Sequence, residues 1–189
     1  MNKKRLIVGM SGASGTPLAI RVLQTLQAMP DVETHLVATE SAVLTAEYES
    51  EMPFEQIIAL ADEYYEGNPI DAAIASGTFK TSGMLVVPCS MKSVAGIANG
   101  FSENLLLRAA DVCVKEKRTL VLAARETPLS PIHLHNLQVL AALANVHIMP
   151  PMMTWYMNPK SIDEMEHHLV AKMLAPFGID VPAFHWGEK

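Results

Sequence analysis

Short apolar runs alternate with amphipathic segments along the chain. Five runs rich in β-branched residues, each bounded by turn residues, predict buried strands at 5–10, 33–38, 84–87, 119–123 and 146–149. Apolar residues at helical spacing predict helices at 17–28, 41–49, 54–61, 105–117 and 131–144. Strands that alternate with helices in this way are typical of a parallel sheet covered by helices on both faces.

A last helix is predicted at the end of the chain. Ser161-Ile-Asp-Glu164 has the pattern of a capping box, and Gly178 is suited to the position just after a helix. One face of this helix would carry Ile162, Met165, Leu169 and Met173. The pattern as a whole predicts one doubly wound α/β domain over residues 1–189, without repeats or linkers. Ligands of such sheets bind beyond the carboxyl ends of the strands, so the loops after strands are the places to search.

The composition excludes several classes of protein. Half of the residues are hydrophobic and 18% are charged, which excludes intrinsic disorder. The formal net charge of −6 and the lack of a long Lys/Arg run argue against nucleic-acid binding. No uninterrupted apolar stretch is long enough to cross a membrane. Two cysteines form no disulfide framework and the histidines are dispersed, so we expect a cytoplasmic protein without a metal.

The first candidate site is the glycine-rich turn Gly9-Met-Ser-Gly12-Ala-Ser14-Gly15, between the first strand and the first helix. Free backbone N–H groups and the helix dipole favour a phosphate or a polar ring edge at such a turn. The spacing G-x-x-G-x-x-G is neither the dinucleotide fingerprint nor a Walker loop, which disfavours an NAD(P) dehydrogenase. A tight turn without a ligand is the alternative.

The second candidate site is Pro88-Cys89-Ser90-Met91-Lys92-Ser93, which follows another buried strand and precedes a helix. Two hydroxyl-bearing loops at adjacent strand ends suit a ligand that has a phosphate and a polar ring. Cys89 is interpreted as a small core residue rather than as a nucleophile.

Charged residues supply the third candidate site. Arg108 and Lys115 are seven residues apart and share a helix face, while Arg125 and Glu126 come directly after the strand 119–123. Arg108 stands among leucines and alanines, where a cation usually pairs with a carboxylate or a phosphate. For residues 115–118 a solvated charged face is the alternative.

The segment 150–159 brings methionines and aromatic residues together, including Tyr156, whose phenol could hydrogen-bond an anion at an apolar pocket. A core rim or a contact between subunits is the alternative for this segment.

The combined segments resemble the flavin prenyltransferase family of the UbiX type. The matching strings are GMSGASG, VVPCSMKSVAGIANG, LLLRAADVCVKE, LVLAARETPLSPIHLHN, IMPPMMTWYMNP and HWGEK. They begin at residue 9 and cover essentially the whole chain. The run R-A-A-D-V-x-x-K-E followed by R-E-x-P-L is far more specific than a single glycine loop.

The resemblance implies a flavodoxin-like or Rossmann-like subunit of a homo-oligomer, commonly a dodecamer, with FMN held between subunits. It assigns FMN binding to Gly12, Ala13, Ser14, Thr39, Ser90, Met91, Lys92, Ser93 and Arg125. It assigns catalysis to Ser14, Glu49, Arg108, Lys115 and Glu126. It assigns the phosphate of the prenyl donor to Lys115, Arg125, Tyr156 and Lys172.

The implied reaction joins the dimethylallyl group of dimethylallyl monophosphate to N5 and C6 of reduced FMN, and expels phosphate. The prenylated FMN then serves a partner decarboxylase of the UbiD type. Cations would stabilise the leaving phosphate, and Ser14 and Glu49 would relay a proton.

The sequence also departs from the family pattern. Lys172 and His185 replace arginines, Glu40 stands where a basic residue is common, and Met153-Thr154-Trp155 replaces smaller residues. These departures favour, as an alternative, a protein that binds or delivers FMN without prenyl transfer. A related FMN-dependent decarboxylase of cysteine-type substrates is a further alternative. That family needs a histidine early in the chain, and His35, inside a strand, is the one histidine before residue 130.

Overall fold

The computed structural model describes residues 3–66, 69, 71–184 and 187. Within these residues one parallel sheet has the strand order β3-β2-β1-β4-β5-β6. The strands are β1 (Lys4–Met10), β2 (Val32–Ala38), β3 (Glu63–Tyr65), β4 (Gly83–Cys89), β5 (Thr119–Ala124) and β6 (Val146–Ile148). From β1 the chain adds β2 and β3 on one side of the sheet, and then crosses to the other side of β1 to add β4, β5 and β6. The switch point, at which ligands bind in such sheets, therefore lies between β1 and β4.

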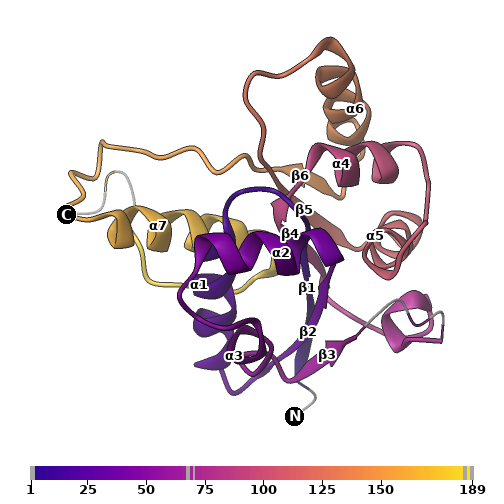
Figure 1. The fold of residues 1–189 in the computed structure, drawn as a ribbon, viewed down its shortest axis with the longest axis horizontal. Helices are drawn as coiled ribbons and strands as arrows, with labels where there is room; N and C mark the ends of the chain where they lie inside the picture. The colour runs from indigo at the N-terminus through magenta and orange to yellow at the C-terminus, as the bar shows by residue number, and fades with distance from the viewer. Residues whose placement is uncertain (1–2, 67–68, 70, 185–186, 188–189) are drawn as a thin grey trace.

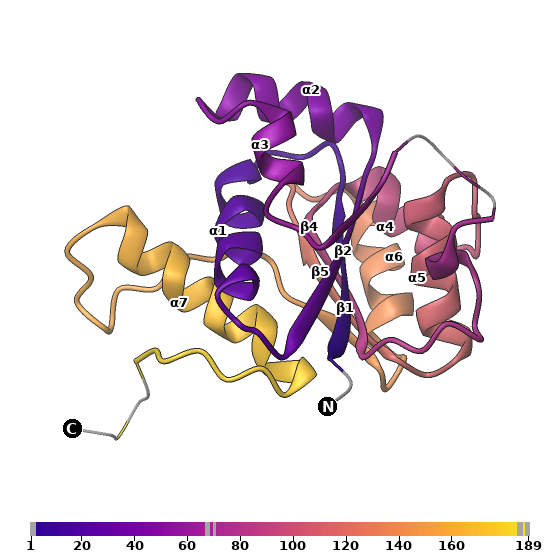
Figure 2. The same ribbon diagram turned by 90° about the horizontal axis from the view of Figure 1, so that it is seen from below.

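Helices cover both faces of the sheet (Figures 1 and 2). One face carries α1 (Thr16–Gln27), α2 (Glu40–Glu49), α3 (Phe54–Ile58) and α7 (Ile162–Leu174). The other carries α4 (Met91–Ala98), α5 (Leu105–Lys115) and α6 (Pro131–Ala141). Two short 3₁₀ turns, η1 (Ala73–Ala75) and η2 (Ala175–Phe177), complete the elements. The part of the chain that the structure describes contains no helix with the length and apolar character needed to span a bilayer.

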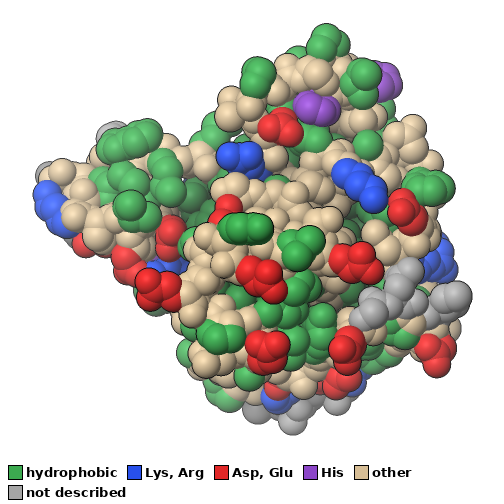
Figure 3. All heavy atoms as spheres, viewed as in Figure 1, with side chains coloured by type: hydrophobic (Ala, Val, Ile, Leu, Met, Phe, Trp, Pro, Cys, Tyr) green, Lys and Arg blue, Asp and Glu red, His purple; other side chains and the backbone are tan. Residues whose placement is uncertain are grey.

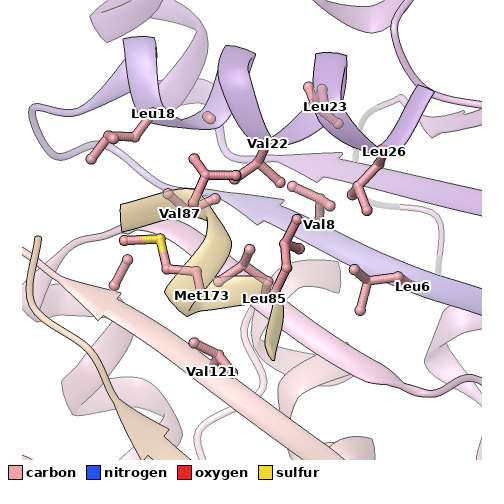
Figure 4. Packing of buried hydrophobic residues seen from close by; sticks show 14 of the residues in the cluster. Leu6, Val8, Leu18, Val22, Leu23, Leu26, Leu85, Val87, Val121 and Met173 are labelled. Atoms are coloured by element: carbon pink, nitrogen blue, oxygen red, sulfur yellow. The ribbon is translucent and has the colours of Figure 1, made fainter. Parts of the chain in front are cut away.

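Two hydrophobic cores lie on opposite sides of the sheet. On β1 the side chains of Leu6 and Val8 enter the core under α1 and α7 (Figure 4), while Ile7 enters the core under α4 and α5. A continuous apolar run therefore serves both cores, because successive side chains of a strand point to opposite faces. Burial of each of these side chains stabilises the fold by about 1.5–3 kcal/mol.

The doubly wound α/β prediction is confirmed, with two corrections in the sheet. A sixth strand, β3, extends the predicted five; it is only three residues long, too short for its periodicity to be recognised. The strand predicted at 84–87 stops before Pro88, yet β4 continues through this proline to Cys89. The register with β5 is irregular between Val86 and Cys89, and a proline fits a strand at such an irregularity.

The last helix also differs in detail from its prediction. The Ser161 hydroxyl accepts the backbone N–H of Glu164, but the carboxylate of Glu164 accepts from the N–H of Lys160 and so forms no reciprocal box. Ile162 is 68% exposed, so the predicted apolar face starts one turn later. Gly178 adopts the left-handed conformation with φ of 64° directly after η2, as its predicted position at the helix end requires.

Candidate active site

A cavity of about 460 Å³ lies beyond the carboxyl ends of β1, β2 and β4, at the switch point of the sheet. Its size falls within the range of roughly 300–1,000 Å³ that is usual for small-molecule sites. It is lined by Ser11, Gly12, Val37, Ala38, Thr39, Glu40, Ser41, Val43, Tyr64, Ser90, Lys92, Ser93 and the segment 103–107. Because these three strands are neighbours, the loops that follow them meet at one place.

Five of the residues predicted to bind the cofactor line this cavity: Gly12, Thr39, Ser90, Lys92 and Ser93. A side chain at Gly12 would collide with Ser41 at the start of α2, so only glycine allows the first loop to approach this helix.

Three other residues predicted in these loops, Ala13, Ser14 and Met91, do not line the cavity. Ser14 is exposed. Ala13 is half-buried within its turn, and its N–H donates to the carbonyl of Ser11 at 2.8 Å. The side chain of Met91 packs into the core under α4.

The first turn of α4 is built to receive an anion. The Ser90 hydroxyl caps the helix by accepting the N–H of Ser93, while the N–H of Ser90 donates to the Ser11 hydroxyl at 2.7 Å. This first turn carries Lys92 and no carboxylate of its own, although the Lys92 ammonium group lies 3.6 Å from the carboxylate of Glu103, which also lines the cavity. A helix N-terminus with a lysine and hydroxyl groups suits a phosphate.

The first turn of α2 faces the same cavity with the opposite charge. Thr39 caps this helix, and Glu40 is its first residue. A carboxylate at a helix N-terminus is stabilised by the helix dipole and offsets its positive end. The cavity therefore has an end at α4 that favours an anion and an end at α2 that favours neutral hydrogen-bond donors. The polar ring, ribityl hydroxyls and phosphate of FMN fit this distribution of residues.

Ser14 and Glu49, both predicted to be catalytic, come together at the N-terminus of α1. One carboxylate oxygen of Glu49 accepts the N–H groups of Gly15 and Thr16, each at 2.9 Å. Partial burial alone would raise the pKa of Glu49, but hydrogen bonds from the Ser14 side chain and from these two N–H groups outweigh it and hold the pKa below its ordinary value. Glu49 is therefore a carboxylate at neutral pH.

Arg125 and Glu126 follow β5 at the same edge of the sheet, and both are exposed. The N–H of Arg125 donates to the carbonyl of Cys89 at 3.0 Å, which ties this segment to the loop that begins α4. The Glu126 carboxylate accepts the N–H of Thr127 at 2.9 Å. Neither side chain lines the cavity.

Arg108 and Lys115 lie on α5 and neither lines the cavity, although Arg108 lines an adjoining hollow that shares the segment 103–105 with it. They line a separate hollow of about 470 Å³ beside the segment 75–78. Arg108 donates to the carbonyl of Ala75 and pairs with Asp111 at 2.7 Å, and Lys115 pairs with Glu116 at 2.7 Å. Because α5 leads back to the start of β5, Lys115 lies near the amino ends of the strands, whereas Gly12 and Ser90 lie at their carboxyl ends.

Tyr156 and Lys172 form a third group. Tyr156 is on the long segment between β6 and α7, and its phenol oxygen lies 3.4 Å from Nε2 of His168 on α7. Lys172 is exposed one helical turn further along α7. None of the predicted phosphate-binding residues therefore lines the cavity in the single chain. The departure at His185 and most of the closing string HWGEK lie outside the described residues.

Two further observations complete the site. Cys89 is fully buried, and burial raises its pKa to about 12, so its thiol stays protonated, as expected of a core residue. Sequence reasoning missed Arg118, whose guanidinium donates to the carbonyls of Gly77 and Phe79 and to the Thr81 hydroxyl. Its place among charged residues gave no signal of this role.

Comparisons with known proteins agree with the geometry. The profile of the Flavoprotein family matches residues 1–173. The flavin prenyltransferase LpdB of Lactiplantibacillus plantarum is 50% identical over 93% of this chain and 94% of its own.

Two solved structures are also similar. A dodecameric FMN-dependent UbiX-like decarboxylase from Escherichia coli O157:H7 has a TM-score of 0.94 and 46% identity, covering 97% of this chain and 100% of its own. AnUbiX (PadA1), in complex with FMN and dimethylallyl pyrophosphate, has a TM-score of 0.91 and 43% identity, covering 95% and 94%. The chain belongs to the Flavoprotein family and, within it, to the flavin prenyltransferases of the UbiX type.

Proposed function

We propose that this protein transfers the dimethylallyl group of dimethylallyl monophosphate to reduced FMN. The observation that carries the proposal is the cavity of about 460 Å³ at the switch point, where an anion-binding helix end lies across from a carboxylate-bearing one. Reduced FMN supplies nucleophilic N5 and C6 atoms when it is bound. The bond from the allylic carbon to the donor oxygen breaks as the bond to N5 forms, and phosphate leaves with the electron pair.

We assign FMN binding to the loops that line the cavity. Ser90, Ser93 and Lys92 hold the phosphate at the start of α4, while Gly12 and Thr39 contact the remainder of the cofactor. In the hydroxyl pair of Ser90 and Ser93, 3.1 Å apart, one hydroxyl donates to the other, and the second hydroxyl hydrogen is available to an anionic oxygen.

We assign proton transfer to Ser14 and Glu49. Glu49 is deprotonated at neutral pH, so its carboxylate can take a proton through the Ser14 hydroxyl. Its two backbone hydrogen bonds fix the carboxylate, so the pair is oriented before the substrates bind.

Departure of phosphate requires cations, and none of the three cations assigned to this role lines the flavin cavity of the single chain. Lys115 belongs to the hollow beside 75–78, Lys172 lies on α7, and Arg125 follows β5. We therefore assign the complete site to a homo-oligomer, a dodecamer by analogy with the Escherichia coli O157:H7 relative, in which neighbouring copies contribute these cations. Exposed apolar side chains on α6 and α2 support such assembly: Ile132, Leu134, Val139, Leu44 and Tyr48.

Mixing two inactive variants tests whether one active site is formed by residues of two subunits. Glu49→Gln and Lys115→Ala are each expected to lose transfer activity, and subunit exchange between them is expected to restore part of it. Failure of exchanged mixtures to regain any activity would place both residues in a site formed by one chain and overturn this assignment. Size-exclusion chromatography with light scattering gives the oligomeric state directly.

The product, prenylated FMN, is handed to a decarboxylase of the UbiD type in the cytoplasm. Two buried cysteines present as free thiols fit a reducing compartment. The alternative of cysteine-type decarboxylation is disfavoured because His35 is buried in β2, hydrogen-bonded to Tyr65 and Glu33, and does not line the cavity.

Release of inorganic phosphate tests the reaction. Anaerobic protein with reduced FMN and dimethylallyl monophosphate should release one phosphate for each flavin converted, and none when the flavin is oxidised or absent. Lys160→Gln, on the exposed segment before α7, is a matched control that should leave the rate unchanged. Tight FMN binding without phosphate release would instead support a protein that binds or delivers the flavin.

A further inference from the structure

Tyr64 lines the flavin cavity, and neither the sequence patterns nor the family resemblance assigned it a role. It is the middle residue of the edge strand β3 (Figure 1) and pairs with Leu36 of β2. The half-buried Tyr64 packs against the core under α1 and α7, and its ring meets the ring of Phe54 on α3 edge to face, with centroids 6.2 Å apart and an interplanar angle of 75°. Tyr64 is therefore an aromatic residue held in place at the border of the cavity.

The two ends of the cavity belong to different strands. Ser90 and Lys92 follow β4 at one end, and Tyr64 belongs to β3 at the other. In the strand order β3-β2-β1-β4 these ends are three strand spacings apart, which is about 14 Å. The residues of β2 and β3 that line the cavity are Val37, Ala38 and Tyr64, and all of them have apolar or aromatic side chains.

We infer that Tyr64 contacts the isoalloxazine ring system of the bound flavin. With the phosphate at the first turn of α4, the ring system of an extended FMN comes to the opposite end of the cavity, at β2 and β3. A flat aromatic system binds best against apolar and aromatic side chains, which these two strands supply. The inference rests on the placement of FMN in the proposed function, and it does not depend on prenyl transfer.

The other tyrosine of β3 provides a matched control. Tyr65 points to the opposite face of the sheet, where its hydroxyl oxygen lies 3.0 Å from Nδ1 of His35 and the two rings stack with centroids 5.9 Å apart. Tyr65 does not line the cavity. Both tyrosines hold the edge strand, so a purely structural role of Tyr64 would make the two positions equivalent for flavin binding.

Titration of the folded variants with oxidised FMN and with riboflavin measures the contact. Tyr64→Leu should weaken the binding of both flavins by about threefold to tenfold, the size expected of one aromatic contact, because the two flavins share the ring system. Tyr64→Phe keeps an aromatic ring and should stay within about twofold of the native affinity. Tyr65→Leu should also stay within about twofold for both flavins.

Flavin fluorescence gives a second readout. A tyrosine in contact with an excited flavin quenches its fluorescence by donating an electron, and a phenylalanine ring does not. Riboflavin bound to Tyr64→Phe should therefore be brighter than riboflavin bound to the native protein, whereas Tyr65→Phe should leave its fluorescence unchanged.

Three results of the titrations would overturn the inference: native affinity for both flavins in Tyr64→Leu, a loss confined to FMN, or an equal loss in Tyr65→Leu. Equal fluorescence of riboflavin bound to the native protein and to Tyr64→Phe would also overturn it. No prenyl donor is present in these experiments, so their failure leaves the transfer reaction itself untouched. A protein that shows the expected flavin binding but releases no phosphate in the transfer assay would overturn the reaction and not this inference.

Discussion

The carboxylate of Glu49, the last residue of α2, accepts the backbone N–H of Gly15, the residue before α1, at 2.9 Å. The same oxygen accepts the N–H of Thr16, so one side chain satisfies two N–H groups that the helix leaves without partners. A residue predicted to be catalytic therefore also joins α2 to the glycine-rich loop. Catalysis and stability are expected to change together at this position.

Glu49→Gln should slow prenyl transfer by about 10²–10⁴-fold, the usual contribution of a positioned base. It should also lower the free energy of unfolding by about 1 kcal/mol, because the charged cap of α1 is lost. Single-turnover rates and urea unfolding measure the two effects. Glu47→Gln, on the exposed side of the same helix, is the control and should change neither. A native transfer rate in Glu49→Gln would contradict the assigned role.

The pKa of Glu49 gives this stabilisation a pH dependence. Hydrogen bonding holds the folded-state pKa below the ordinary value of 4.5, so the carboxylate stabilises the fold fully above that value. The contribution is lost as the pH falls through the folded-state pKa. The difference in unfolding free energy between the native protein and Glu49→Gln should be constant near neutral pH and shrink below about 4.5. A difference that grows on acidification would refute this account.

The charges at the two ends of the flavin cavity predict opposite effects on flavin selectivity. Lys92→Gln should reduce the preference for FMN over riboflavin about threefold, because an exposed lysine contributes modestly to holding a phosphate. Glu40→Gln should raise FMN affinity by a similar factor, since the repelling carboxylate is removed. Fluorescence titration with both flavins measures these ratios, and added salt should diminish both effects. Changes of the same sign in the two variants would contradict the roles assigned to these two charges.

Cys89 is predicted to be dispensable for the chemistry. Its pKa of about 12 leaves almost no thiolate at neutral pH, and the residue is fully buried. Cys89→Ala should retain the native transfer rate at a cost in stability of about 1 kcal/mol. Iodoacetamide should leave the folded protein unlabelled at this position, as peptide mass spectrometry can show. Loss of transfer in a folded Cys89→Ala protein would show that the thiol takes part in the reaction.

Arg118 is predicted to be structural. Its guanidinium holds the segment 77–81 through the carbonyls of Gly77 and Phe79 and the Thr81 hydroxyl. Arg118→Met should lower the unfolding free energy by about 2–3 kcal/mol, because hydrogen bonds to a charged donor are lost. Lys80→Gln, an exposed cation of the same segment, should stay within about 0.5 kcal/mol of the native value. Equal stability of the two variants in urea would argue against this role.

The predictable part of the fold follows from hydrophobic pattern. Runs such as Arg5–Met10 and Thr119–Ala123 were recognisable because buried parallel strands are apolar on both faces. The strand Glu63–Tyr65 was not recognisable, since three residues with a charged first position carry no period. Pro88 gave a misleading stop signal because the sheet accommodates it at an irregular register.

The site was predictable to the extent that it follows strand ends. Gly12, Thr39 and Ser90 could be grouped because loops after neighbouring strands share one edge of the sheet. The contact between Glu49 and Gly15 spans 34 residues and depends on how α2 packs, which no local pattern encodes. Lys115 illustrates the reverse case: resemblance assigned it to the site, whereas the single chain holds it on another surface, beside Glu116.

The surface around α2 and α3 is rich in carboxylates (Figure 3). The hollow beside 75–78 carries the cations Lys80, Arg108 and Lys115, which outnumber its one carboxylate, Glu116. Opposite charges on different faces of one chain favour head-to-tail contacts between copies. Such contacts are expected to weaken as the salt concentration rises. Sedimentation of the native protein over a range of salt would detect this, and assembly that strengthens with salt would contradict it.

The central claim is that this chain prenylates reduced FMN. Anaerobic incubation with reduced FMN and dimethylallyl monophosphate, followed by mass spectrometry of the extracted flavin, tests it most directly. The account predicts a flavin heavier by one dimethylallyl unit from the native protein, and unmodified FMN from Glu49→Gln. Recovery of unmodified FMN alone from native, FMN-loaded protein would contradict it.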